Sequence, residues 1–128
     1  MISRRWGPAV VWAAFILLLT SVPNPNVLDV RGGDKLVHFC LYAIFSLLAL
    51  RGAWSRPARR LTWLWVLVAI SVFGALDELH QLFIPGRSAE VADWLADSAG
   101  DAAGILLGAF ILRRASRRAP PSPDVDDA

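Results

Sequence analysis

Apolar residues gather in four long stretches along the chain, and Pro, Gly or charged residues close each stretch. The stretches cover about residues 6–22, 34–50, 61–83 and 91–112. In lipid a spanning segment must be a helix, because its backbone groups have no water to bond. At ~1.5 Å per residue, stretches of this length reach roughly 25–35 Å, which is enough to cross a bilayer. The pattern therefore predicts an all-α fold, a four-transmembrane-helix bundle.

The first and fourth stretches need separate arguments. The first follows Arg4 and Arg5 as a signal peptide would, but no small-residue cleavage site comes after it, so we expect a retained signal anchor. The fourth is the weakest span, because its continuous apolar run covers only residues 102–112 and acidic residues precede it. The last residues carry Pro and Asp without an apolar pattern. We therefore expect a transmembrane domain over residues 1–114 and a disordered cytoplasmic tail over 115–128.

The placement of positive charge predicts the orientation in the membrane. The chain has 13 Lys and Arg residues, and three of them lie on the first and third loops: Arg31, Lys35 and Arg87. The others lie at the two termini and in the second loop: Arg4, Arg5, Arg51, Arg56, Arg59, Arg60, Arg113, Arg114, Arg117 and Arg118. Because cytoplasmic loops carry the excess of Lys and Arg, both termini are predicted to be cytoplasmic. No nucleic-acid-binding motif accompanies the arginines, so we expect membrane lipids as their partners.

Ionisable residues recur at one depth in three of the predicted helices. His38, Glu78 and Asp97 lie ~6–9 Å inside the outer ends of their helices. A turn of ~100° per residue places each of them on a polar stripe of its helix. Charged residues within a span usually face the bundle interior or a wet cavity. We therefore predict a polar pocket at the extracytoplasmic side, formed by Asp34, Lys35, His38, Glu78, Gln81, Arg87, Asp93 and Asp97.

Plainer roles are open for three of these residues. Asp34 follows two glycines and could cap its helix, and Lys35 could simply place its ammonium among the headgroups. His38 could be a hydrogen-bonded packing residue rather than a ligand. Glu78 is harder to explain in this way, because a carboxylate inside the membrane is a functional candidate by default.

The fourth stretch carries two further signals. Gly100, Gly104 and Gly108 repeat every four residues, a small-xxx-small pattern that predicts close approach of another helix. Asp101 lies near the middle of this predicted span, at a depth that no cation of the sequence reaches. We therefore expect Asp101 to be protonated, hydrogen-bonded to a neighbouring helix, or reached by water.

Two segments resemble a known family. DKLVHFCLYAIFSLL resembles the D-K-x-x-H-F motif of VanZ-like membrane proteins. The second segment resembles the family's E-x-x-Q, G-R and D-x-x-x-N-x-x-G signature and reads ELHQLFIPGRSAEVADWLADSAGDAAG. It departs from the family at two positions: Asp97 replaces the usual Asn, and Asp101 replaces a residue that is usually small or apolar. The resemblance covers about residues 34–108. The family's polar positions fall on Asp34, Lys35, His38, Glu78, Gln81, Arg87, Asp93 and Gly100.

The resemblance implies a multi-pass protein of the bacterial cytoplasmic (inner) membrane, whose namesake is associated with low-level teicoplanin resistance. The first function that fits is binding of an envelope lipid or a glycopeptide-related ligand. In this hypothesis Arg87, Lys35 and His38 meet the phosphate or carboxylate of a lipid-linked envelope precursor.

The alternative is a membrane-embedded hydrolase or transferase. Glu78 would be its general acid or base, His38 the partner of Glu78, and Arg87 an electrostatic stabiliser. A divalent metal on His38, Glu78, Asp93 and Asp97 is a variant of this hypothesis; otherwise we expect no cofactor, because no cofactor motif is present. Proton-coupled transport along the aspartates of the fourth stretch ranks last, because it would need a homo-oligomer, and the sequence does not fix the number of copies.

Overall fold

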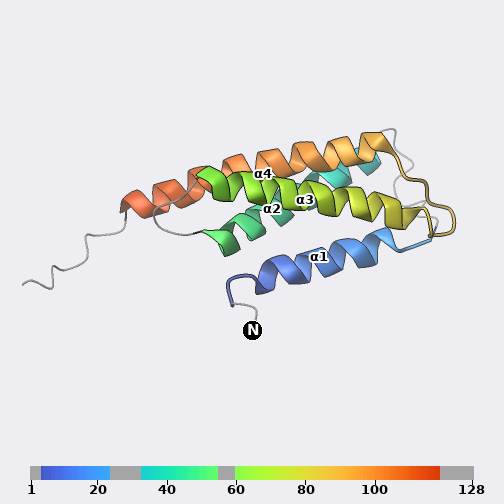
Figure 1. The fold of residues 1–128 in the computed structure, drawn as a ribbon, viewed down its shortest axis with the longest axis horizontal. Helices are drawn as coiled ribbons and strands as arrows, with labels where there is room; N and C mark the ends of the chain where they lie inside the picture. Colours follow the sequence, from blue (N-terminus) through green and yellow to red (C-terminus); the bar gives the residue numbers. More distant parts are fainter. Residues whose placement is uncertain (1–3, 24–32, 55–59, 119–128) are drawn as a thin grey trace, which may run out of the picture.

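The computed structural model describes residues 4–23, 33–54 and 60–118, and these residues form four helices and no strand. The helices are α1 (Gly7–Thr20), α2 (Gly33–Ala53), α3 (Arg60–Gln81) and α4 (Val91–Arg118). They run side by side as an elongated bundle (Figure 1). The predicted all-α fold is confirmed for this part of the chain.

Three of the helices are long and apolar enough to cross a membrane: α2, α3 over Leu61–Gln81, and α4 over Val91–Ala115. The fourth stretch, predicted to be the weakest span, is among these three and forms the longest helix, with 28 residues. Its acids Asp93, Asp97 and Asp101 are buried against other helices. α1 has only 14 residues, which is ~21 Å of helix.

Only the first part of the predicted tail, up to residue 118, lies within the described residues. Residues 115–118 continue α4, while 119–128 lie outside the described residues. Arg31, Arg56 and Arg59, which entered the orientation argument, also lie outside them.

The closest packing in the bundle is between α2 and α4. A Cβ added at Gly100 would collide with the backbone carbonyl of Phe39, and one at Gly104 with that of Ala43. The Ser46 hydroxyl of α2 donates a hydrogen bond of 3.0 Å to the backbone carbonyl of Asp101. The close approach predicted from the glycine repeat is therefore present, and it aligns the polar stripes of the two helices.

α1 is attached more loosely than the other helices. The Trp6 ring lies against Gly52 of α2, and the Trp12 indole N–H donates to the Leu41 carbonyl at 2.9 Å. Between these contacts and α3, an apolar cavity of about 520 Å³ opens, lined by residues such as Ala13, Phe45 and Ile70. α1 therefore covers one side of the bundle without filling the space beneath it.

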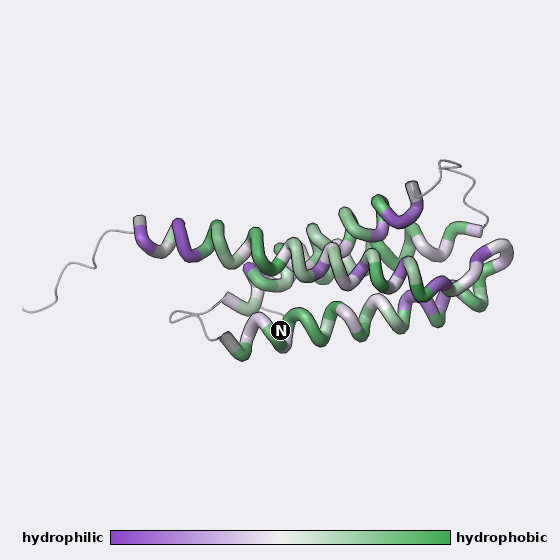
Figure 2. The backbone as a smooth tube through the Cα atoms, turned by 90° about the horizontal axis from the view of Figure 1, so that it is seen from above, coloured by the Kyte–Doolittle hydropathy of each residue, from purple (hydrophilic) through white to green (hydrophobic). Residues whose placement is uncertain are grey.

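The bundle exposes apolar residues along its length. Hydrophilic positions are frequent toward its two ends and hydrophobic ones between them (Figure 2). The exposed hydrophobic side chains include Leu76, Leu79, Leu106 and Phe110. A soluble protein rarely exposes so much apolar surface, so this exterior suits contact with lipid.

Candidate functional site

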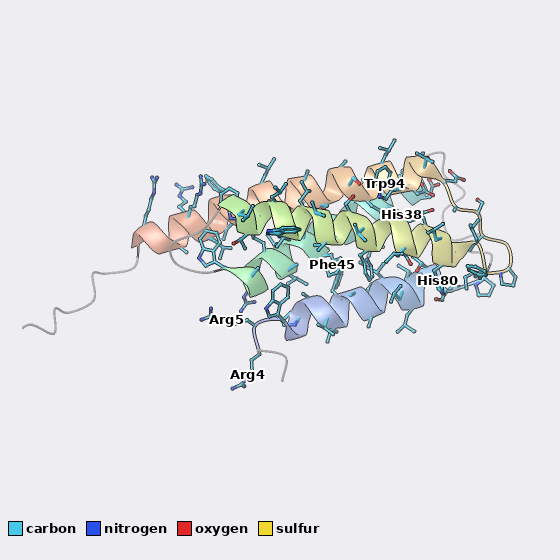
Figure 3. All side chains as sticks on the ribbon, in the orientation of Figure 1. Arg4, Arg5, His38, Phe45, His80 and Trp94 are labelled. Atoms are coloured by element: carbon cyan, nitrogen blue, oxygen red, sulfur yellow. The ribbon has the colours of Figure 1, made fainter. Side chains whose placement is uncertain are left out.

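Polar side chains from three helices meet at one end of the bundle. His38 of α2 lies at this end, and Arg4 and Arg5 lie at the opposite end (Figure 3). Glu78 of α3 and Asp97 of α4 lie beside His38. All three are buried: the exposed fraction of the surface is 7% for His38, 6% for Glu78 and 1% for Asp97. Together with the residues that contact them, they form what we call the polar cluster: Asp34, Lys35, His38, Glu78, Gln81, Glu90, Asp93 and Asp97.

His38 lies at the centre of the polar cluster. Its Nδ1 atom is 2.9 Å from Asp97 Oδ1 and 3.9 Å from Glu78 Oε1. When Asp97 is ionised, the hydrogen bond between them requires a proton on Nδ1, and in the neutral imidazole this leaves a lone pair on Nε2. An imidazole fixed in this way can bind a cation or accept a proton.

The loop between α3 and α4 fixes Glu78. Gly86 has φ 78°, a left-handed conformation that other residues rarely adopt, and the Arg87 N–H closes the turn on the Ile84 carbonyl at 3.1 Å. The turn brings the Glu90 backbone N–H to 2.9 Å from Glu78 Oε2. The Gln81 amide donates to Glu78 Oε1 at 3.3 Å, so both carboxylate oxygens accept hydrogen bonds from the protein.

Lys35 holds together the rim of the polar cluster. Its ammonium nitrogen lies 3.1 Å from Asp34, 3.0 Å from Asp93 and 3.3 Å from Glu90. Asp34 and Glu90 are exposed, whereas Asp93 is buried. Because three carboxylates surround Lys35, its charge is already used within the protein.

The sequence did not single out Glu90, because this residue lies in a loop outside the helical stripes. One signal was available: Glu90 directly precedes α4, and its carbonyl accepts hydrogen bonds from the N–H groups of Asp93 and Trp94. A residue at that position lies on the same turn as Asp93.

Arg87 lies apart from the polar cluster. The sequence predicted that Arg87 belongs to the pocket, but its guanidinium donates to the Leu19 carbonyl at 3.3 Å. The last carbonyls of a helix lack partners within the helix, and an arginine is a common donor to them. Arg87 thus links the third loop to the end of α1.

Asp77, the neighbour of Glu78, was not among the residues predicted for the pocket. It is buried, and the Thr20 hydroxyl at the end of α1 donates to its Oδ1 atom at 2.8 Å. The signal for it was its position next to Glu78, at the edge of the polar stripe of α3.

Several buried oxygens near the polar cluster have no hydrogen-bond partner among the described residues. They are the Tyr42 hydroxyl, Oδ2 of Asp77, Oδ2 of Asp97 and both carboxyl oxygens of Asp101. The only hydrogen bond found for Asp101 from another helix therefore goes to its backbone, not to its side chain. Such orphaned oxygens need a partner such as water, a proton or an ion.

Two groups of side chains are arranged closely enough to hold a metal ion. One group consists of His38, Glu78 and Asp93, and the other of Asp34, Glu90 and Asp93. Within each group the ligand atoms lie within 4.8 Å of one another. The polar cluster is also strongly acidic, because its five carboxylates face one lysine. Its chemistry therefore suits cation binding or proton transfer better than binding of a bare anion.

The family comparison covers the whole bundle. A family model described as VanZ/LLP1 matches residues 4–113. The chain belongs to the VanZ/LLP1 family. The VanZ/LLP1 match contains every residue of the polar cluster and confirms the resemblance seen in the sequence. No curated protein matches the chain. No solved structure matches it either.

With its apolar exterior and three helices of spanning length, this VanZ/LLP1 chain is a membrane protein.

Proposed function

We propose that this protein crosses the bacterial cytoplasmic membrane four times, with both termini in the cytoplasm and the polar cluster on the extracytoplasmic side. The support is the separation of charge along the bundle. Arg4 and Arg5 lie at the end opposite His38 (Figure 3), and Arg51 is in the last turn of α2. For α1 to cross, it needs the residues that flank it or a local thinning of the bilayer, because 14 helical residues are shorter than a ~30 Å hydrocarbon core.

Reporter fusions test this orientation. A reporter that is active only outside the cytoplasm should be inactive when fused after residue 118 and active when inserted at Gly86. The opposite pair of results would refute the proposed orientation.

We propose further that the polar cluster binds the headgroup of an envelope lipid or a lipid-linked envelope precursor. The observation that carries this function is that three helices each bury at least one ionisable side chain at the same end of the bundle, whose exterior is apolar. Polar groups inside a membrane are costly, so their convergence indicates a role beyond folding. Low-level teicoplanin resistance, the property linked to the family's namesake, is then the first phenotype to measure.

The geometry changes which headgroup chemistry the cluster favours. The sequence suggested that Arg87 and Lys35 meet a phosphate or carboxylate, but Arg87 donates to α1 and three carboxylates surround Lys35. We therefore propose that the cluster recognises hydroxyl or ammonium groups of the headgroup. Carboxylates accept hydrogen bonds from both of these groups.

Alanine variants test the binding function in cells. Glu78→Ala, Gln81→Ala and Asp93→Ala should each change sensitivity to envelope-directed antibiotics at matched expression. Arg87→Ala serves as the control outside the cluster and should have a smaller effect. Wild-type behaviour of all three cluster variants would mean that the cluster is structural.

The alternative function is a hydrolase or transferase, and the contact between His38 and Asp97 favours it. An imidazole oriented by a carboxylate, with a second carboxylate 3.9 Å away, is an arrangement suited to general acid–base catalysis. Purified protein incubated with lipid-linked precursors distinguishes the two functions. An enzyme yields a cleaved or transferred product that His38→Gln does not form, whereas a binding protein returns the lipid unchanged.

A further inference from the structure

We propose that His38, Glu78 and Asp93 bind one divalent transition-metal ion, while Asp97 positions the imidazole of His38. This inference does not depend on the lipid proposed above. Each of the three side chains comes from a different helix, and each is more than nine-tenths buried. Their ligand atoms lie within 4.8 Å of one another. Atoms that share an ion at ~2.0–2.2 Å are at most ~4.4 Å apart, so only a small closure is needed.

The surroundings of His38 match those of a metal-bound histidine. Metal-binding histidines usually donate their second ring N–H to a carboxylate, which fixes the tautomer and the ring orientation. Asp97 Oδ1 lies 2.9 Å from Nδ1 and supplies such a carboxylate. In the neutral ring the lone pair is then on Nε2, whereas Nδ1 is the nitrogen 3.9 Å from Glu78 Oε1, so the ring must shift for Nε2 and Glu78 to share an ion.

Unpartnered oxygens next to the cluster are an independent sign of a missing partner. Oδ2 of Asp97, a residue with 1% of its surface exposed, has no hydrogen-bond partner among the described residues. The Tyr42 hydroxyl, one turn along α2 from His38, is buried too and has only the Asp77 carboxyl beside it within the described part of the chain. A Cβ built at Gly74 would lie 3.2 Å from the Tyr42 ring and 3.3 Å from Asp97 Oδ2, so both groups border one space between the helices. Water carried by a bound ion would satisfy them.

The distribution of charge places the ion on the buried group rather than at the rim. Asp34, Glu90 and Asp93 also lie within 4.8 Å of one another, but the Lys35 ammonium already contacts all three. Of the buried group Lys35 contacts only Asp93, and among the described ion pairs it reaches neither Glu78 nor Asp97. A buried excess of negative charge is costly, and a divalent cation would offset it.

The ligand types narrow the choice of metal. One imidazole nitrogen and two carboxylates suit Zn²⁺ or Mn²⁺, whereas Ca²⁺ and Mg²⁺ prefer oxygen ligands alone. The site therefore differs from the oxygen-rich centre that the sequence suggested, because Asp97 contacts His38 instead of the ion.

Titration of the full-length protein in lipid nanodiscs with Mn²⁺ tests the proposal. After removal of metal with a chelator, we expect one Mn²⁺ bound per chain by electron paramagnetic resonance, displaced by Zn²⁺. Pulsed measurements on the wild-type protein should detect a directly bound imidazole nitrogen, and this readout needs no variant. His38→Gln and Glu78→Gln should each weaken binding at least tenfold. Asp97→Asn should weaken it about tenfold, because Asp97 holds the imidazole rather than the ion.

Matched controls separate the buried site from the surface. His80→Gln removes the other histidine of the chain and should bind Mn²⁺ as the wild type does. Asp34→Asn removes an acid of the rim and should weaken Mn²⁺ binding much less than Glu78→Gln does. Absence of stoichiometric binding, or binding without nitrogen coupling, would overturn the proposal. An equal loss in Asp34→Asn and Glu78→Gln would overturn it too, because the ion would then lie among the exposed carboxylates.

Discussion

Replacing Asp97 isolates the contact that orients His38. Asp97→Ala removes the acceptor 2.9 Å from Nδ1 and leaves a histidine with only 7% of its surface exposed. A buried donor without a partner costs about 1–3 kcal/mol. Asp97→Asn keeps an acceptor oxygen of the same shape, and hydrogen bonds between membrane helices contribute only ~0.6 kcal/mol on average. We therefore expect the Ala variant to be about 1–3 kcal/mol less stable than the wild type, and the Asn variant to lie within about 1 kcal/mol of it.

Unfolding of the purified protein in mixed micelles, with increasing SDS and helicity as the signal, gives both free energies. His38→Ala combined with Asp97→Ala completes a double-mutant cycle. The cycle should show that most of the loss in Asp97→Ala disappears once His38 is absent. If Asp97→Ala unfolds at the same SDS fraction as Asp97→Asn, the hydrogen bond to His38 does not stabilise the fold and our reasoning fails.

Three further substitutions test the packing of the bundle by the same SDS titration or by folded yield. Gly104→Ala should lower the free energy of unfolding by about 1–3 kcal/mol, because the new methyl group meets the α2 backbone. Gly108→Ala meets leucine side chains first and should cost less; equal losses in the two variants would contradict close backbone packing at Gly104. Asp101→Ala should raise the yield of folded protein, because its unpartnered carboxyl is lost and its bonded backbone carbonyl remains, and a large drop in yield would refute this. Thr20→Val should destabilise the protein by about 0.6–1.7 kcal/mol by removing the bond to Asp77, with Thr62→Val as the control.

The sequence predicted the helices and the inward-facing residues well, because both follow from periodicity. His38, Glu78 and Asp97 each lie on a stripe set by the helical repeat, and burial of that stripe is the cheapest arrangement in lipid. The glycine repeat of α4 was equally informative, because only one residue type allows backbones to approach so closely.

Loop residues could not be placed in this way. Arg87 and Glu90 lie in a turn whose path depends on Gly86, and a helical repeat says nothing about where a turn directs its side chains. The length of α4 was underestimated for a different reason. The predicted stretch ended at residue 112, where the apolar pattern stops, whereas the helix continues to Arg118.

The buried acids of α4 have a consequence for how the protein is made. Asp93, Asp97 and Asp101 all face other helices, and a single charged residue at the centre of an isolated helix costs about 2.5–3.5 kcal/mol on insertion. α4 follows α2 and α3 in the sequence. These partners are therefore synthesised before it, and they can receive its aspartates as it enters the bilayer. Stable insertion of the C-terminal helix should thus require co-expression of the preceding ones, even when the two parts are supplied as separate polypeptides.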